Sequence, residues 1–496
     1  MANRLHQPHV PLPEIHWSPN EQWVWRKLRR GEEADFNVRY GVELVAWEEE
    51  AWNEEEKARR LIRPEFLYTV LLHEPWRSAL SNWGFRLGGA YFAKAIEMPH
   101  AEVAHEFWLK SCRIKHGLLF YDARFVHRLV IGGCFVKGLA NLSSLHTDVD
   151  LGLDQSRLGY VYLNGAHLGG SFSANEATVA GDLSMDGAAI QGNLFMDKSR
   201  FKGGVRLIGV RVGGQACLRE VILSGDLSMD GVAIQDALLM NKSHFKGGVR
   251  LVGAQVGGQA SLTEAIFEGQ FSMDGASIRE ALLTSKSQFK SGVRLIGAQV
   301  SGQANLSEAS FAGLLSMDGA VIQDALLMGR SQFKGGVRLI GVQVRGQANL
   351  SEATFAEELS MAGAAIQHDL LMDKNQFKGA LQLSELQVGG GTRLVEASIK
   401  GDLSMDQAKI KGSLLMERTQ FEAEVRLLGV QVNGQAILSG ATFAGRLIMD
   451  GSTVQGGLFM DKCHFAGEVR LPGVHVGGQA NLSEATFAKQ LTMDRA

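Results

Sequence analysis

A strict repeat of 44 residues governs most of this chain. The tripeptide Ser184-Met185-Asp186 returns at this interval without drift, and its later copies begin at Ser228, Ser272, Ser316, Ser360, Ser404, Ile448 and Thr492. A repeat this regular is typical of one structural unit that is stacked on itself many times. We therefore expect a solenoid, which grows by addition, in place of the several globular domains that 496 residues would otherwise suggest.

Within the repeat, the apolar residues follow a fixed spacing of two, three, two and four residues. Leu183, Met185, Ala188 and Ile190 form one such block, and the next block begins at Leu194. A gap of two is the period of a β-strand, whereas a helix places its apolar residues three and four apart. Each block therefore predicts two short strands with inward side chains, and the recurring methionines are expected to fill the core.

A column of charges indicates how many blocks complete one coil. Residues 22 apart alternate in sign along the column Lys198, Glu220, Lys242, Glu264, Lys286, Glu308, Arg330, Glu352, Lys374, Glu396 and Arg418. Neighbouring opposite charges attract and like charges repel, so this alternation favours residues 22 apart being neighbours. We predict that two blocks make one coil, with four short strands and four corners, and that the coils stack in parallel.

Three pentapeptides fit the pattern A-(D/N)-L-x-x: Ala304-Asn305-Leu306-Ser307-Glu308, Ala348-Asn349-Leu350-Ser351-Glu352 and Ala480-Asn481-Leu482-Ser483-Glu484. The pattern resembles the pentapeptide-repeat family, and the resemblance implies a right-handed quadrilateral parallel β-helix. The family's coil has four faces of five residues, whereas faces of five and six residues alternate here. The extra residue falls in corners that contain glycine, such as Gly192 and Gly213, where we expect glycine to supply a positive φ.

The chain divides into a helical head at residues 1–84 and a solenoid at residues 85–496, with about 18 coils. Ser18 followed by Pro19 and Glu21 predicts the start of a helix, because this order supplies an N-cap, a first-turn proline and a capping box. Further helices are expected from Glu43 to Leu61 and from Pro64 through Leu72 to an end near Glu74-Pro75. We expect this head to cap the first coil, since an open coil end exposes strand edges.

The composition restricts the class of protein. The formal net charge is −3 and the pI is about 6.6, so the chain as a whole is not expected to bind polyanions. Four cysteines do not suffice for a disulfide scaffold, and the sequence lacks the long apolar run that predicts a membrane span. The amino terminus lacks the apolar core of a signal peptide. We therefore expect a soluble protein of the reducing cytoplasm.

Two pairs of residues near the first repeats are one coil apart. Cys112 and Cys134 could approach within disulfide distance, but their inward positions favour two reduced thiols. His105 and His127 fall at a corner with no third ligand in their column, which favours surface histidines over a metal site. The sequence contains no Walker loop, nucleophile elbow or zinc signature, so we expect no catalytic residue, cofactor or metal.

Two kinds of charged residue recur with the repeat. Aspartates precede a corner glycine, or Gln407 in one copy, and their many copies favour a role in turns over catalysis: Asp186, Asp230, Asp274, Asp318, Asp406 and Asp450. Outward arginines lie on alternate coils with lysines at the adjoining corner: Arg206, Arg250, Arg294, Arg338, Arg426 and Arg470, and Lys202, Lys246, Lys290, Lys334 and Lys378. This basic ridge predicts contacts with phosphate or an acidic partner, and a solvated face that keeps the strands soluble is the alternative.

These observations favour a non-enzymatic scaffold, in which a rigid solenoid docks a protein partner. The first alternative is a nucleic-acid-associated protein or a mimic of DNA, because proteins that the pattern resembles mimic DNA to protect gyrase. Mimicry requires an acidic surface, and the alternating charges and the basic ridge argue against it. The second alternative is an enzyme whose activity lies in the helical head.

The last coil predicts an interface of its own. Phe487, Leu491 and Met493 belong to a final coil that stops in the middle of a repeat, and an exposed strand edge tends to pair with another chain. We expect this end to be occupied by a second copy, in a two-fold end-to-end homodimer, or by a protein partner. The resemblance implies the same, because several family members dimerise through their C-terminal coils.

Overall fold

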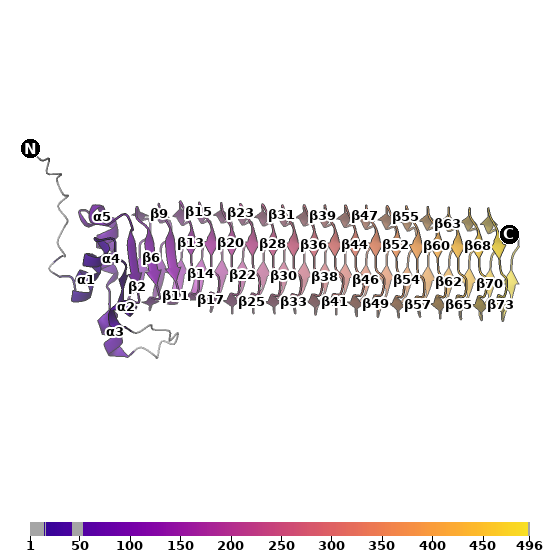
Figure 1. Ribbon diagram of the computed structural model, residues 1–496, viewed down its shortest axis with the longest axis horizontal. Helices are drawn as coiled ribbons and strands as arrows, with labels where there is room; N and C mark the ends of the chain where they lie inside the picture. Colours follow the sequence, from indigo (N-terminus) through magenta and orange to yellow (C-terminus); the bar gives the residue numbers. More distant parts are fainter. Residues whose placement is uncertain (1–13, 15, 42–52, 495–496) are drawn as a thin grey trace, which may run out of the picture. The chain divides into compact units, whose positions relative to one another are not determined.

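The computed structural model describes residues 14, 16–41 and 53–494. The chain forms two compact units, Met1–Asp236 and Ala237–Ala496. Both units are built from short parallel strands stacked coil upon coil, with about 19 turns of about 22 residues in all (Figure 1). The prediction of a mainly β, parallel solenoid with coils of this length is therefore confirmed.

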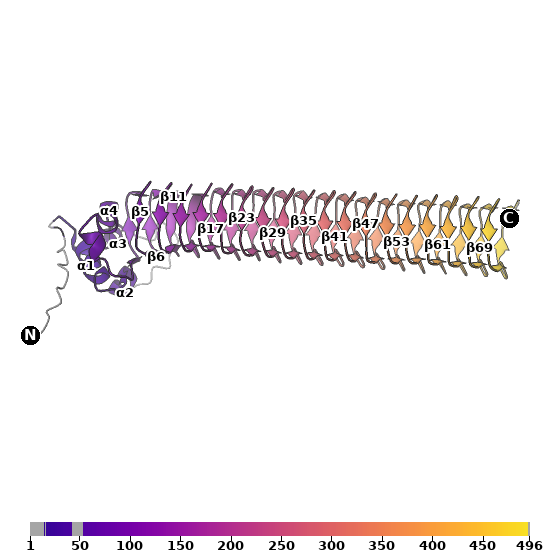
Figure 2. The same ribbon diagram turned by 90° about the horizontal axis from the view of Figure 1, so that it is seen from above.

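Each regular coil contributes strands to four faces, which we name A to D in chain order. In one coil they are β36 (Leu282–Leu283), β37 (Gln288–Phe289), β38 (Val293–Arg294) and β39 (Gln299–Val300). Within a unit, the strands of one regular coil pair in parallel with their equivalents in the next coil, as β36 does with β40 (Ala304–Asn305). Because the chain visits the four faces in order, face A lies opposite face C, and face B opposite face D (Figures 1 and 2).

Inward side chains from successive coils form continuous columns in the core. On face B, phenylalanine rings from Phe245 to Phe377 stack with their centroids 4.8 to 5.1 Å apart. The methionines of the repeated tripeptide are buried, as Met273 and Met317 illustrate. The predicted role of these methionines in the core is confirmed.

The alternating charges occupy the narrow corner between faces A and B. Lys286, Glu308 and their equivalents are the third residues of β-turns and have φ near +60°. Residues 22 apart lie on neighbouring coils: Arg330 Nε is 3.1 Å from Glu352 Oε2, and Arg418 Nη2 is 2.9 Å from Glu396 Oε1. The alternation thus pairs residues of successive coils, as the sequence predicted.

The expected role of the wide-corner glycines is wrong. In the regular coils positive φ angles occur at the narrow corners, and Gly192 and Gly213 have no positive φ. These glycines are required for a different reason, because a neighbouring coil passes very close to them. A Cβ atom added to Gly213 would lie 2.2 Å from the carbonyl oxygen of Gln191, and one added to Gly389 would lie 2.1 Å from that of Gln367.

Buried hydroxyl groups at the narrow corner between faces A and B link neighbouring coils. Ser331 is 1% exposed; its Oγ donates to the carbonyl of Leu306 at 2.7 Å and accepts from the amide of Ala309 at 3.2 Å. Small polar residues repeat this arrangement at the same corner of other coils: Ser156, Ser199, Ser287 and Thr419. Ser452 makes the equivalent bonds at the narrow corner between faces C and D. The thiols of Cys112, Cys134 and Cys463 have the position of Ser331 in their own coils and approach backbone carbonyls.

Replacing Ser331 with alanine is expected to lower the free energy of unfolding by about 1–3 kcal/mol, because it removes a partner from a buried amide and a buried carbonyl. Urea denaturation, monitored by circular dichroism, measures the change in the free energy of unfolding. Ser307→Ala, in a partly exposed turn of the preceding coil, is the control and should shift the value by less than about 0.5 kcal/mol. Equal effects of the two substitutions would contradict the role of the buried hydroxyl.

Helices precede the first coil. Helix α1 (Pro19–Leu28) begins with the predicted Ser18 cap and capping box, and α4 (Pro64–Leu72) begins at the predicted Pro64 and ends two residues before Glu74. Of the helix expected from Glu43 to Leu61, residues 43–52 lie outside the described residues, and α3 covers Glu54–Arg60. Two shorter helices, α2 (Phe36–Tyr40) and α5 (Trp76–Ala79), complete the set within the described residues.

The helical segment also supplies a strand that the sequence did not predict. Strand β1 (Ala34–Asp35) pairs in parallel with Leu87 and Gly88 of β2 (Phe85–Gly88), the first strand of face A. The ring of Phe66 lies 6.4 Å from that of Phe85. These contacts cover the first coil, and whether residues 1–84 also fold as a separate domain stays a prediction.

Candidate interaction surfaces

The predicted basic ridge lies on face C, where its members form one column. In the second unit Arg250, Arg294 and Arg338 alternate with Ser272 and Ser316 on neighbouring strands. Arg426 and Arg470 continue this column, and Arg206 has the same place in the first unit. The side chains point outward, since the residue before each arginine belongs to the core.

Aspartates of the preceding coil neutralise this column. Arg294 and Arg338 each lie 2.8 Å from a carboxylate oxygen of that coil, on Asp274 and Asp318 respectively. The same ion pair joins Arg206 to Asp186, Arg426 to Asp406 and Arg470 to Asp450. The hydrogen bond from Arg206 to Asp186 raises the pKa of the guanidinium. The ridge is therefore a ladder of ion pairs with balanced charge, in place of the purely basic surface that the arginines alone suggested.

The aspartates also bind the backbone of the following coil, which differs from the expected local turn capping. Oδ1 of Asp274 accepts from the amide of Ile296 in the next coil at 2.9 Å. Asp450 is the informative exception, because its Oδ1 is buried and has no hydrogen-bond partner within the described residues. The equivalent residue of the next coil is Pro472, which has no N–H to donate.

The lysines beside the ridge are exposed at the wide corner between faces B and C: Lys202, Lys246, Lys290 and Lys334. Lys290 Nζ lies 3.1 Å from Glu268, and this pair is open to solvent. Exposed pairs contribute at most about 1 kcal/mol, so these lysines remain available to a partner.

Changing Asp274, Asp318 and Asp406 to asparagine is expected to uncover affinity for nucleic acid. Asparagine retains an oxygen for the backbone amide but removes the charge that neutralises each arginine. We expect retardation of duplex DNA at low salt that weakens as salt rises, with the wild type binding at least tenfold more weakly. Absence of retardation by the variant would show that the arginines do not reach phosphates.

Face A carries a row of apolar side chains that the sequence analysis missed. In the second unit Leu239, Leu283 and Leu327 point outward from β28 (Leu238–Leu239), β36 and β44 (Leu326–Leu327), and each is half-buried. Ser261 and Asn305 lie between them on the intervening coils. Beyond Asn349 the column contains Leu371, Leu415, Ile437 and Phe459, with Arg393 between Leu371 and Leu415.

A signal for this row was present in the sequence. Leu283 stands between Leu282, which points inward, and the buried Thr284, so strand alternation places it outside. Because Leu282 is itself apolar, the outward leucine reads as part of the core pattern. Outward leucines that recur on alternate coils of one face are more apolar surface than scattered exposed residues supply, and exposed apolar surface of this kind marks protein-binding sites.

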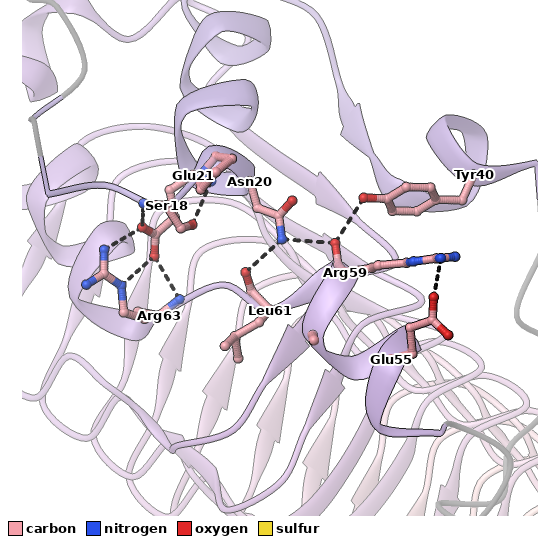
Figure 3. Close-up of a pocket in the computed structure, with 10 residues that line it drawn as sticks. Ser18, Asn20, Glu21, Tyr40, Glu55, Arg59, Leu61 and Arg63 are labelled. Atoms are coloured by element: carbon pink, nitrogen blue, oxygen red, sulfur yellow. Dashed lines mark hydrogen bonds and ion pairs between the residues drawn. The ribbon is translucent and has the colours of Figure 1, made fainter.

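The helical segment contains a cavity of about 460 Å³, bordered by Asn20, Tyr40 and Arg63 (Figure 3). The carboxylate of Glu21 is fully buried beside it and accepts from Arg63 Nη2 at 2.6 Å and from the amide of Ser18 at 2.7 Å. Burial by itself would raise the pKa of Glu21, but the hydrogen bonds from Arg63 and Ser18 lower it further than burial raises it. The carboxylate therefore stays ionised and fixes the start of α1 to the start of α4.

The histidine corner holds two residues of adjacent coils, His105 and His127, beside a cavity of about 570 Å³. His105 Nε2 lies 3.0 Å from the carbonyl of Arg77, and burial lowers the pKa of His105. Cys112 and Cys134 are free and buried, and burial raises the pKa of the Cys134 thiol. The predicted inward position of both cysteines is confirmed, and their reduced state stays a prediction.

The last coil is more exposed than those before it. Leu491 pairs with Val469 on face C, and the ring of Phe487 stacks on that of Phe465 at 4.9 Å. Met493 is 46% exposed. The end-to-end interface at these three residues stays a prediction.

Within the described residues, no three His, Cys, Asp or Glu side chains are grouped closely enough to hold a metal ion. Among the helices that the structure describes, none is both long and apolar enough to span a bilayer. In comparisons with known proteins, no family model matches the chain and no curated sequence matches it.

Proposed function

We propose that this chain is a non-enzymatic interaction scaffold of the pentapeptide-repeat type, which acts in the cytoplasm and docks a protein on face A. The observation that carries the proposal is the outward apolar row of the second unit, from Leu239 to Phe459. Burial of apolar surface is the main favourable contribution to protein association. Because the row stands on a stacked sheet, its side chains are held in place before the partner arrives, which lowers the entropic cost of binding.

The other surfaces support this choice of face. On face C the arginines are paired with aspartates, so a partner would have to displace existing ion pairs. Face D presents polar side chains such as Gln299, Gln343 and Gln387, which are well hydrated. A nucleic-acid partner is the weaker candidate, because the aspartates already balance the charge of the arginine column.

Charged substitutions on two faces test the proposal. Leu283, Leu327 and Leu371 are changed to lysine on face A, and Gln299, Gln343 and Gln387 are changed to lysine on face D as the matched control. Tagged chains are incubated with extract of the native cell that also contains the untagged chain, and retained proteins are identified by mass spectrometry. We expect the face A variant to lose the proteins that the wild type and the face D variant retain. Equal retention by both variants would refute docking on face A.

A further inference from the structure

The outer surface of face A is striped across the coils in the second unit. In the first six coils, an apolar coil with Ala and Leu alternates with a polar coil with Gln and Ser or Asn. The outward pairs are Ala237 and Leu239, Gln259 and Ser261, Ala281 and Leu283, Gln303 and Asn305, Ala325 and Leu327, and Gln347 and Asn349. Coils stack about 4.8 Å apart, so the stripes recur about every 9.6 Å.

The stripes match the charges at the neighbouring corner. Lys286 and Arg330 belong to the apolar coils of Leu283 and Leu327, whereas Glu308 belongs to the polar coil of Asn305. Lys286 Nζ and Glu308 lie 3.9 Å apart, and both side chains are at least half exposed. Such pairs are weak and leave both charges available to a partner. The size and polarity of the outward side chains on face A and the charge at the neighbouring corner therefore all repeat every two coils.

We infer that the occupant of face A is a second copy of this chain, packed antiparallel and displaced by one coil; this inference rests on the proposed function. A partner must repeat at the spacing of the stripes to remain in register over many coils. An α-helix with a seven-residue repeat advances about 10.5 Å, and after five repeats it is nearly one coil out of step. A second copy of the chain has the same coil spacing and the same order of stripes, and therefore has the required period.

A two-fold axis that runs parallel to the strands of face A, between Asn349 and Leu371, gives a complementary register. An apolar side chain of one copy then meets a polar side chain of the other at five of the six pairs along the row, and Leu283 faces Ile437 at the sixth. Large side chains face smaller ones at four pairs, and Leu327 faces Arg393. The facing pairs are Asn349 with Leu371, Asn305 with Leu415, Ser261 with Phe459 and Leu239 with Asn481. On the adjoining outward column they are Ala237 with Gln479, Gln259 with Gly457 and Ala281 with Gln435.

Charges complement one another in the same register. Because this axis keeps the narrow corners of the two copies on the same side, opposite signs face each other there. The facing pairs are Glu352 with Lys374, Arg330 with Glu396, Glu308 with Arg418, Glu264 with Lys462 and Lys242 with Glu484, whereas Lys286 faces the uncharged Gly440. If apolar coils met apolar coils, lysines would face lysines, which disfavours that alternative.

The outer surface of face A in the second unit is large enough for a reversible dimer. It spans the twelve coils from β28 to β72 (Ala480–Asn481), as the pairings along face A show. At about 4.8 Å per coil and about 10 Å across, a second copy would bury roughly 1,100 Å² in total, near the lower limit of stable interfaces. We therefore expect a dimer that dissociates on dilution.

Light scattering on the purified full chain tests the inference. The apparent mass of the wild-type protein is expected to rise with concentration from 53.9 kDa towards twice that value. Leu283→Lys, Leu327→Lys and Leu371→Lys together should raise the dissociation constant at least tenfold, whereas lysines at Gln299, Gln343 and Gln387 should not change it. Circular dichroism confirms that both variants are folded. A monomeric wild type at all concentrations, or a dimer that survives the face A lysines, would overturn the inference.

Cysteine pairs test the register independently. A chain with Asn305→Cys mixed with a chain with Leu415→Cys should form a disulfide-linked dimer on oxidation, and neither chain alone should do so. Asn305→Cys mixed with Gln431→Cys on face D is the control and should remain unlinked. Cross-linking of Asn305→Cys to itself would overturn the antiparallel arrangement. A monomer whose face A still retains another protein from extract would refute the second copy and leave the scaffold proposal intact.

Discussion

Alanine at Gly389 is expected to destabilise the second unit by roughly 3 kcal/mol or more, which is the largest effect of any single substitution considered. The new Cβ would lie 2.1 Å from the carbonyl oxygen of Gln367. That oxygen belongs to the backbone of the preceding coil, so relief requires the two coils to separate. Thermal denaturation of the purified variant measures the loss.

Gly292→Ala is the matched control, because it is also a wide-corner glycine without a positive φ. Its nearest atom would be the carbonyl oxygen of Leu314 at 3.7 Å, an ordinary contact. This change should leave the stability unchanged or raise it by up to about 1 kcal/mol, because alanine lowers the conformational entropy of the unfolded chain. If the two variants denatured alike, coil spacing at Gly389 would not be the constraint that we describe.

Deletion of residues 1–84 is expected to make the remaining chain aggregate. Strand β1 pairs with Leu87 and Gly88, and α4 places Phe66 against Phe85, so the deletion exposes a strand edge and core side chains together. Exposed edges of this kind recruit other chains. Sedimentation and light scattering at increasing concentrations measure the effect.

A milder change separates the cap from the rest of the solenoid. Arg63→Ala leaves the buried carboxylate of Glu21 without its cation and should destabilise the helical segment by roughly 2–4 kcal/mol, less than a fully buried pair because Arg63 is half-exposed. The pKa of Glu21 is lowered in the folded chain, so the stabilisation by its carboxylate is present above the unfolded pKa and is lost as pH falls through the folded pKa.

For the deletion of residues 1–84, a product that stays monomeric and soluble would show that the helical segment does not protect the first coil.

The coil was predictable from the sequence because its signals are periodic. The alternation of Lys286 and Glu308 defined the coil length, and Leu282 with its inward equivalents defined the strands. Strand β1 was not predictable, since two residues, Ala34 and Asp35, carry no period. The capping box at Ser18 was, because it is a local motif.

The surfaces were harder to predict than the core, for two reasons. The arginines on face C were located correctly, but Arg294 pairs with Asp274 diagonally across neighbouring coils, so the two residues do not share one column of the repeat. Leu283 was overlooked because a leucine between two inward residues looks like core in sequence. Only the assignment of each residue to the inside or the outside of a strand distinguishes these cases.

The measurement that tests the docking role of face A most directly is site-specific photo-cross-linking in the native cell. A photoreactive phenylalanine is placed at Leu327, Arg338 or Gln343, which occupy faces A, C and D of one coil. We predict a light-dependent adduct from position 327, with a second copy or another protein, and none from positions 338 and 343. Adducts from face C or face D without one from Leu327 would contradict the account.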